Sequence, residues 1–408
     1  MLELFRSDNV VVRSVPTSDT RRWVVTFDNY GIGHGFDRPG FGEEFLRNSG
    51  ISAVHVLGVG DDWYQYPEMI AAMAAVRQAV SGAERVMTYG SSMGGYAALR
   101  FADAAGAHAV LAISPQYSVD PLKVPFEKRW LQDGRRIQWL PEIDGKLHCR
   151  ARPVVVFDPV VDDGRQVALI RNDIDISPIR LPYVSHPATT FLSEIGMLKP
   201  LVLQALSGEI DAANFIRQAR RDRRKSSVYI SNLAQAQPTH RPSLALSLGR
   251  MSVRMAPSNP LAGVALARIL SSVGEHDQAV SEMERVVELA KAEPIYLIHY
   301  VNVLRAAKRP ADALPFARQV VETWPQMAHL HAWEGAVLWE SGAHSDAIAA
   351  VERAMAGDPG CLRYRRTLKT YRKQMTAIRA GVTRPLGWVK RWSDGWLGMV
   401  SHPASWFR

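Results

Sequence analysis

A repeat with a period of 34 residues constrains the second half of the chain more than any other feature of the sequence. It is clearest in four alanines, Ala245, Ala279, Ala313 and Ala347, each 34 positions after the previous one. Gly335 stands twelve residues before the last alanine, and a proline stands twelve residues after three of the four. Units of this length bury their apolar faces against neighbouring copies. No strand pattern follows residue 206, so the repeat predicts an all-α solenoid.

The period and the small residues resemble the tetratricopeptide repeat, in which two antiparallel helices pack closely at small side chains. The resemblance covers about residues 226–360, and its first unit is degenerate, with prolines at positions 238 and 242. Residues 361–378 are expected to form a capping helix, which gives a repeat domain at 226–378. The resemblance implies a protein partner, or self-association through the repeats.

The first half, residues 9–205, alternates short β-branched runs with amphipathic helical runs. The segments NVVVRSV, WVVTF, ISAVHVLGV, RVMTYG, HAVLAIS and PVVVFD are expected to be strands. Strands that alternate with helices and are mostly apolar throughout favour a mostly parallel, doubly wound sheet covered on both faces. The expected fold class is therefore α/β, with an insertion at residues 114–150 that contains Trp130, Trp139 and Arg129. A loop of this length is usually functional or a small subdomain.

The motif Gly90-Ser91-Ser92-Met93-Gly94 matches G-x-S-x-G and carries the chemistry of this half. It follows an apolar strand and opens a helix, which is the setting of a nucleophile elbow that presents Ser92 above the sheet. Glycines are required where such a turn crowds the backbone. The Met93 amide then lies at a helix amino terminus, where it can stabilise an oxyanion.

These residues resemble the α/β-hydrolase family over roughly residues 9–205, which gives a hydrolase domain at 1–205. The resemblance implies the chain order nucleophile, acid, base. His186 follows SPIRLPYVS, the last expected strand, and precedes a helix, where the base of that family stands. The acid is expected after PVVVFD, where Asp158, Asp162 and Asp163 occur. Aligned with the family loop, Asp162 is the acid and would hold the histidine tautomer. Asp158 is the alternative, and Asp163 is interpreted as a helix cap.

The second oxyanion donor is expected from the loop after WVVTF, as the backbone amide of Asn29 or Tyr30. The family more often has His-Gly at this point, where this chain has Asp28-Asn29, and we expect the Asp28 carboxylate to point away from the oxyanion. Asp62, Trp63 and Tyr64 follow another strand at the carboxyl edge of the sheet, where ligands bind. Carboxylates beside aromatics suit a sugar, so these three are candidate substrate contacts. A loop packed by its own aromatics is the alternative.

Two segments lie outside both domains. Residues 206–225 include the run RQARRDRRK and are interpreted as a basic helical linker; no nucleic acid is expected as a partner, because no nucleic-acid-binding module surrounds the run. Residues 379–408 form a tail in which Trp388, Trp392 and Trp396 fall on one helical face. We expect the tail to dock on the repeat domain, and contact with a membrane surface is the alternative.

The remaining features exclude several classes. No apolar run approaches the roughly 18 residues of a membrane span, and the start MLELFRSDNVVVR is unlike a secretory signal, so a cytoplasmic protein is expected. The two cysteines, Cys149 and Cys361, exclude a disulfide framework. No dinucleotide fingerprint, P-loop or zinc motif occurs, so neither a cofactor nor a metal is expected.

The sequence as a whole therefore predicts a serine esterase that works through an acyl-enzyme. Its substrate would be an ester, in one reading an acylated glycan or another large substrate recruited by the repeats. An acyltransferase with the same triad, and a non-catalytic adaptor with a degenerate hydrolase domain, are the alternatives.

Overall fold

The computed structural model describes residues 1–33, 35–237 and 241–380. The chain divides into two compact units, the first comprising Met1–Asn232 and the second beginning at Leu233. Each unit is described by itself below.

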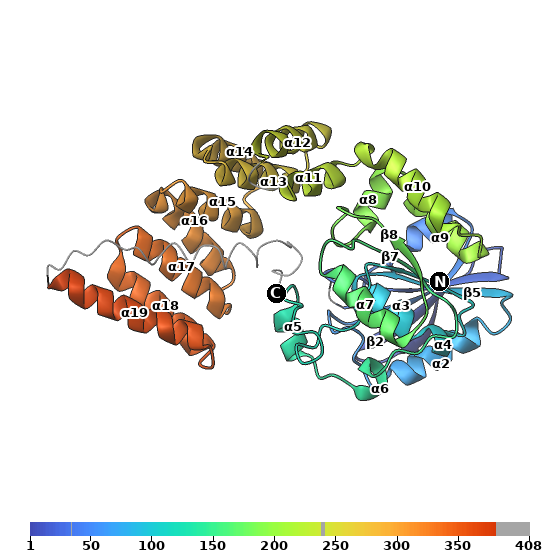
Figure 1. Ribbon diagram of the computed structural model, residues 1–408. Coiled ribbons are helices and arrows are strands. Elements are labelled where there is room, and N and C mark those ends of the chain that lie inside the picture. The colour runs from blue at the N-terminus through green and yellow to red at the C-terminus, as the bar shows by residue number, and fades with distance from the viewer. Residues whose placement is uncertain (34, 238–240, 381–408) are drawn as a thin grey trace. The chain divides into compact units, whose positions relative to one another are not determined.

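The first unit is built on one eight-stranded sheet (Figure 1). Its strands are β1 (Leu2–Arg6), β2 (Val10–Val15), β3 (Arg22–Phe27), β4 (Ser52–Gly58), β5 (Arg85–Ser91), β6 (Ala109–Ile113), β7 (Val154–Phe157) and β8 (Ser177–Arg180). They lie in the order β1-β2-β4-β3-β5-β6-β7-β8, and the run from β4 to β8 is parallel. Strand β2 is antiparallel to both of its neighbours, β1 and β4. The expected mostly parallel sheet is thus present.

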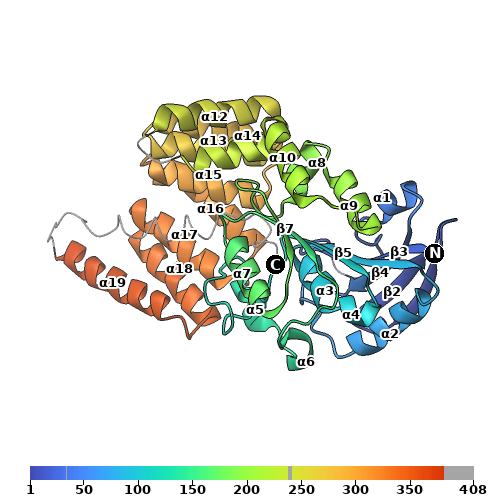
Figure 2. The ribbon, with the colours of Figure 1, turned by 45° about the vertical axis from the view of Figure 1, so that its right-hand side comes forward.

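Helices cover both faces of the sheet. Those of the first unit are α1 (Glu43–Asn48), α2 (Met69–Ala79), α3 (Met93–Arg100), α4 (Ala102–Ala105), α5 (Leu131–Arg136), α6 (Pro141–Asp144), α7 (Asp163–Asp173), α8 (Thr189–Glu194), α9 (Leu198–Ser207), α10 (Ala212–Asp222) and α11 (Ser227–Gln235), with a 3₁₀ turn η1 (Arg223–Lys225). Figures 1 and 2 show α2 and α4 on one side of the sheet and α9 on the other.

Alternation along the strands supplies a core to each face. In β3, Trp23, Val25 and Phe27 join a core with residues of α2, α3, α4 and α7. The intervening Val24 and Thr26 are fully buried on the opposite face. A sheet buried on both sides needs strands that are apolar throughout, which explains the continuous β-branched runs.

The insertion at 114–150 is attached to the sheet domain through a buried carboxylate. Asp144 accepts hydrogen bonds from the Tyr96 hydroxyl of α3 (2.9 Å), from Ser118 Oγ (3.0 Å) and from Lys123 Nζ (2.6 Å). A buried charge is tolerated only when it is paired and hydrogen-bonded in this way. The insertion is therefore a fixed part of the first unit.

The segment at 206–225 differs from the expected linker, because it belongs to the first unit. Helix α10 packs against β8, and Phe215 and Ala219 on its apolar face are buried. Further along, Ser226 and Ser227 donate to the Glu194 carboxylate, and Asn232 Nδ2 donates to the Tyr183 carbonyl (3.3 Å). The basic run occupies only the solvent side of an amphipathic helix, so charge alone was a poor guide to a boundary.

The second unit consists of helix pairs with the predicted 34-residue spacing. Its helices after α11 are α12 (Pro242–Met255), α13 (Pro260–Ser272), α14 (His276–Leu289), α15 (Pro294–Ala306), α16 (Pro310–Thr323), α17 (Ala328–Glu340), α18 (His344–Gly357) and α19 (Leu362–Arg379). Each of the four repeat alanines lies near the start of one of α12, α14, α16 and α18 and is buried. A Cβ on Gly335 of α17 would lie 3.1 Å from the Ala347 carbonyl oxygen, so the small residues do permit close packing. The tetratricopeptide-like repeats are confirmed.

Three smaller predictions have different outcomes. Both cysteines are free thiols. Within the described residues, no helix is both long enough and apolar enough to cross a bilayer. The tryptophans of the tail lie outside the described residues, so its docking stays a prediction.

Candidate active site

Ser92 sits on a strained turn between β5 and α3. Its backbone adopts φ 55° and ψ −120°, which is rare for a residue with a side chain and is typical of a nucleophile elbow. The flanking glycines make the turn possible. A Cβ on Gly90 would lie 2.1 Å from the Gly94 carbonyl oxygen, and a Cβ on Gly94 would lie 2.4 Å from the Phe27 carbonyl oxygen. The glycines of the motif therefore account for the tight turn at Ser92.

His186 lies opposite Ser92, as the sequence predicted. Its Nε2 is 2.8 Å from Ser92 Oγ, and both residues are almost fully buried. The loop before His186 is held by Asp158, whose Oδ2 accepts from the Ser185 amide at 2.8 Å. Tyr183 and Ser185 both have positive φ in this loop, so its path is irregular and depends on such contacts.

The carboxylate that meets His186 is Asp163, and the choice of Asp162 was wrong. Both oxygens of Asp163 lie within hydrogen-bond distance of His186 Nδ1, at 2.9 and 3.0 Å. Asp163 is the first residue of α7 and is only 1% exposed. Asp162 points to the surface instead, with a side chain 38% exposed that accepts from Arg165. The start of the helix decides which of two adjacent carboxylates faces inward.

Asp158, the alternative acid, has a different task. Its Oδ1 accepts from the Val160 amide (2.9 Å) and its Oδ2 from the Ser185 amide, so both oxygens hold backbone. Burial raises the pKa of this carboxyl, which the two amides counteract. Asp158 therefore shapes the loop of the base without contacting the His186 ring.

The surroundings of Asp163 fix its charge. Burial alone would raise the pKa of the carboxyl, but His186 and Arg129 outweigh burial and lower the pKa to about 2. Arg129 Nη1 donates to Asp163 at 2.7 Å and also pairs with Glu127. Asp163 is therefore ionised at neutral pH and accepts the Nδ1 proton of His186. This leaves Nε2 as the acceptor for the Ser92 hydroxyl.

Met93, one of the expected oxyanion donors, follows Ser92, and the loop that carries the other two approaches the same turn, because a Cβ on Gly94 would lie 2.9 Å from the Asp28 carbonyl oxygen. Met93 is the first residue of α3, and amides in the first turn have no acceptor within the helix. The loop after β3 is held at both ends, because the Asp28 amide donates to the Tyr64 hydroxyl (2.5 Å) and the Gly31 amide to Asp61 Oδ1 (2.9 Å). Asn29 and Tyr30 lie between these anchors. The Asp28 carboxylate is engaged by Arg38 at 2.8 Å, which agrees with the expectation that it points away.

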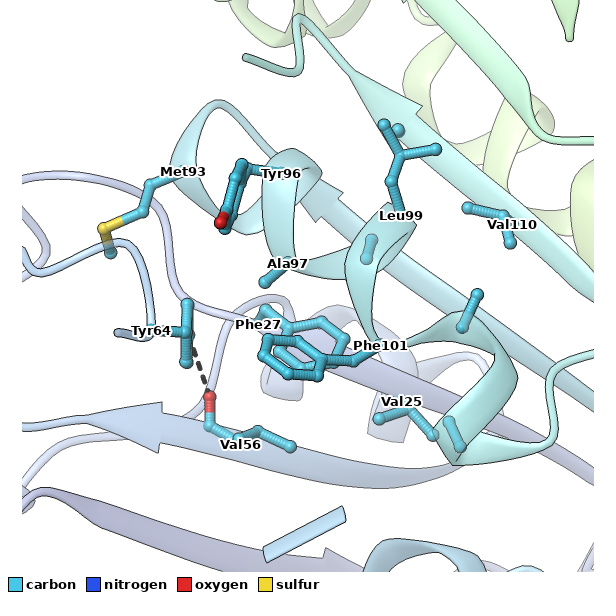
Figure 3. Close-up of a cluster of buried hydrophobic side chains, with 14 of the residues drawn as sticks. Val25, Phe27, Val56, Tyr64, Met93, Tyr96, Ala97, Leu99, Phe101 and Val110 are labelled. Atoms are coloured by element: carbon cyan, nitrogen blue, oxygen red, sulfur yellow. Dashed lines mark hydrogen bonds between the residues drawn. The ribbon is translucent and has the colours of Figure 1, made fainter. Parts of the chain in front are cut away.

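The three candidate sugar contacts do not form a binding surface. Tyr64 is a core residue, and Figure 3 shows it beside Phe27, with its hydroxyl bonded to the Val56 carbonyl. Trp63 is fully buried, and Asp62 pairs with Arg136 at 2.6 Å. The alternative of a loop packed by its own aromatics is the correct one. Trp63 and Tyr64 both have positive φ, and at these residues the loop after β4 turns into the core.

The sequence does not predict two contacts of Ser92 and His186. Gln116 Nε2 donates to Ser92 Oγ at 3.1 Å, and the Trp130 ring lies edge-on to His186, with 5.1 Å between centroids. Gln116 follows β6, the strand beside β5, so the neighbouring carboxyl ends of parallel strands were a usable signal. Trp130 comes from the insertion, and no local pattern indicates where an insertion folds.

A pocket of about 440 Å³ begins next to the elbow. Asn29, Ser91 and Pro187 belong to its lining, and the last two are the chain neighbours of Ser92 and His186. Its other walls include the apolar side chains of Phe41, Phe45, Tyr89 and Leu198. Thr189, Ser193 and Lys199 add polar groups to the lining. A mostly apolar pocket with a few polar groups is typical of a small-molecule site. No group of three potential metal ligands occurs among the described residues.

Comparisons with known proteins bear on the fold only weakly. No protein-family model and no curated protein matches the chain. Among solved structures, MamA of Desulfovibrio magneticus RS-1 is similar over 43% of this chain and 92% of its own, at 19% identity and a TM-score of 0.32. YrrB, a TPR protein with an unusual peptide-binding site, is similar over 44% of this chain and 92% of its own, at 15% identity and a TM-score of 0.33. The capsule O-acetyltransferase of Neisseria meningitidis serogroup A is similar over 44% of this chain and 85% of its own, at 13% identity and a TM-score of 0.32. Such low TM-scores carry no argument, so the repeats are identified from their helix pairs.

Proposed function

We propose that the first unit is a serine esterase of the α/β-hydrolase type. The observation that carries the proposal is one continuous chain of hydrogen bonds, from Ser92 through His186 to Asp163, with lengths of 2.8 and 2.9 Å. The three residues occur in the chain order nucleophile, acid, base, after β5, β7 and β8. A non-catalytic adaptor does not require an ionised carboxylate, an oriented histidine and a serine on a strained turn within hydrogen-bond distance of one another.

The proposed reaction proceeds through an acyl-enzyme. His186 Nε2 takes the proton of Ser92 as Oγ bonds to the ester carbonyl carbon, and the oxyanion accepts from the amides of Met93 and of Asn29 or Tyr30. The same proton passes to the leaving alcohol as its C–O bond breaks. Water then attacks the acyl-enzyme with His186 as base, and Ser92 regains its proton.

We assign the acyl group of the ester to the 440 Å³ pocket, because its walls are mostly apolar and its lining includes Asn29 of the oxyanion loop and Ser91, the neighbour of Ser92. An alcohol of any size then leaves on the other side of the scissile bond. The repeats would recruit a large substrate, such as an acylated glycan, or a protein that carries it, since arrays of this type present extended binding surfaces.

Transfer of the acyl group to a sugar hydroxyl is the second candidate. The near-complete burial of Ser92 and His186 favours it, because a closed site limits the access of water to the acyl-enzyme. Product analysis with and without a methyl glycoside acceptor separates the two reactions. An acylated glycoside identifies a transferase, and free acid alone identifies an esterase.

Turnover of nitrophenyl esters tests the proposal. Ser92→Ala should lower kcat by several orders of magnitude without unfolding the protein, because it removes one hydroxyl from a turn. Ser81→Ala, which changes an exposed serine that bonds only within its own turn, is the matched control and should keep full activity. Activity of Ser92→Ala within tenfold of wild type would rule out Ser92 as the nucleophile.

A further inference from the structure

Gln116 makes a contact that the triad does not require. It is 1% exposed, and its side-chain amide lies between two groups of the site. Its Nε2 is 3.1 Å from Ser92 Oγ, and its Oε1 is 3.3 Å from the indole nitrogen of Trp63. Trp63 is itself fully buried against Tyr30 and Trp130.

The indole fixes the direction of every hydrogen bond in this row. A tryptophan Nε1–H can only donate, so the oxygen of the Gln116 amide must face Trp63. The amide nitrogen then faces Ser92 and donates to its Oγ. Since the Ser92 oxygen receives that hydrogen bond, its own proton is directed at His186 Nε2. The hydrogen bonds therefore run one way, from Trp63 through Gln116 and Ser92 to His186.

We propose that Gln116 is a fourth catalytic side chain, whose amide N–H stabilises negative charge on Ser92 Oγ, and that Trp63 is the positioning residue that orients it. The proposal rests on the esterase function proposed above. Charge develops on Oγ twice: when the proton leaves for His186 during attack, and when the C–Oγ bond of the acyl-enzyme breaks as Oγ departs. In both steps Gln116 keeps its proton and only donates a hydrogen bond.

The contribution is differential because the bond changes character along the reaction. In the resting enzyme both partners are neutral, whereas in the transition states the acceptor carries charge. A charge-assisted hydrogen bond is about twice as strong as a neutral one. In a buried site, loss of one such donor costs roughly 10- to 100-fold in rate. The expected effect falls on kcat, since this hydrogen bond strengthens only when Ser92 Oγ becomes charged.

Two variants remove the donor, a third removes the group that orients it, and a fourth is the control. Gln116→Met keeps an unbranched side chain of similar length but cannot donate, and Gln116→Glu keeps the shape and faces Ser92 with an acceptor. Trp63→Phe removes only the orienting indole N–H. Trp139→Phe is the matched control, because the Trp139 indole donates to the Gly134 carbonyl (2.9 Å) and not to Gln116.

The experiment measures the second-order rate of Ser92 labelling by an alkyl fluorophosphonate, and kcat and KM for a nitrophenyl ester, in the full-length protein. Thermal unfolding of each variant checks its fold. We expect roughly 10- to 100-fold losses of labelling rate and kcat in Gln116→Met, at least as large in Gln116→Glu, with KM changed less than threefold. Trp63→Phe should lose less, and Trp139→Phe should match wild type.

The double variant Trp63→Phe/Gln116→Met separates positioning from packing. If Trp63 acts through Gln116, the double variant is no slower than Gln116→Met alone. Two results overturn this inference and leave the proposed esterase function intact, provided that the wild type is labelled. One is a double variant whose loss of rate is the product of the two single losses. The other is a folded Gln116 variant whose labelling rate and kcat stay within threefold of wild type. A wild type that does not label at all overturns the proposed function, and this inference with it.

Discussion

Replacing Asp163 by asparagine tests the central electrostatic feature of the site. The change keeps the shape of the side chain but removes the charge that two groups use. His186 loses the acceptor that fixes its Nδ1 proton, and Arg129 loses one of its two carboxylate partners. Since Arg129 keeps its ion pair with Glu127, we expect the variant to fold.

The change should lower both kcat and the free energy of unfolding. An asparagine in place of the orienting carboxylate favours the wrong histidine tautomer, which lowers kcat about 10⁴-fold. The pKa of Asp163 falls from 3.8 to about 2 on folding, which corresponds to a stabilisation of about 2 kcal/mol. Because the folded pKa is the lower one, this stabilisation is present above about pH 4. It is lost as the pH falls from about 4 to about 2.

Nitrophenyl ester turnover and urea unfolding of three single variants provide the assay. Asp163→Asn should lose about 10⁴-fold in kcat and should unfold with about 2 kcal/mol less free energy at pH 7. Asp162→Asn changes a surface carboxylate and should stay close to wild type in both. Asp158→Asn should show an intermediate loss, because it weakens the loop that carries His186. A large loss of kcat in Asp162→Asn together with a small loss in Asp163→Asn would refute the assignment of Asp163 as the acid.

Three further predictions concern other parts of the first unit. Leu198→Trp narrows the pocket, so the ratio of kcat/KM for a nitrophenyl octanoate to that for the acetate should fall roughly tenfold; an unchanged ratio would contradict the acyl assignment. Burial and the nearby carboxylates of Asp133 and Asp62 raise the pKa of Asp61 to about 6. The unfolding free energy of wild type relative to Asp61→Asn should therefore fall as the pH rises from about 4 to about 6, because the folded carboxyl holds its proton more tightly; urea denaturation at several pH values measures this, and a rise would contradict it. A chain ending at residue 236 should keep its circular dichroism and its nitrophenyl acetate turnover. A chain ending at 210 should lose both, because it lacks the contact of Asn232 with the loop that carries His186. Equal activity of the two chains would instead place the end of the first domain near residue 205.

The parts of the site that local spacing encodes could be predicted from the sequence. Gly90 and Gly94 specify a turn in which a Cβ at either position would collide with backbone, so the motif and its setting predict the turn at Ser92. His186 was found from its position after the last strand. The alanines of the repeats were equally informative, because helix pairs at a fixed period require small residues at fixed positions.

The parts that depend on tertiary contacts could not be predicted. Asp162 and Asp163 differ only in which side of the first turn of α7 they occupy, and sequence does not specify that rotation. Tyr64 looked like a ligand-binding aromatic, but a backbone with positive φ turns it into the core. The segment after residue 205 resembles a linker in sequence because its charges dominate, whereas the burial of Phe215 on the other face of α10 depends on tertiary packing.

The most direct test of the account is where a fluorophosphonate reacts. The probe phosphonylates an activated serine, with fluoride as the leaving group. After labelling of the full-length protein, peptide mass spectrometry should find the adduct on Ser92, and it should be absent from Ser92→Ala and strongly reduced in His186→Ala. A wild type without adduct, or an adduct that persists on another residue of Ser92→Ala at an equal rate, would contradict an esterase built on Ser92, His186 and Asp163.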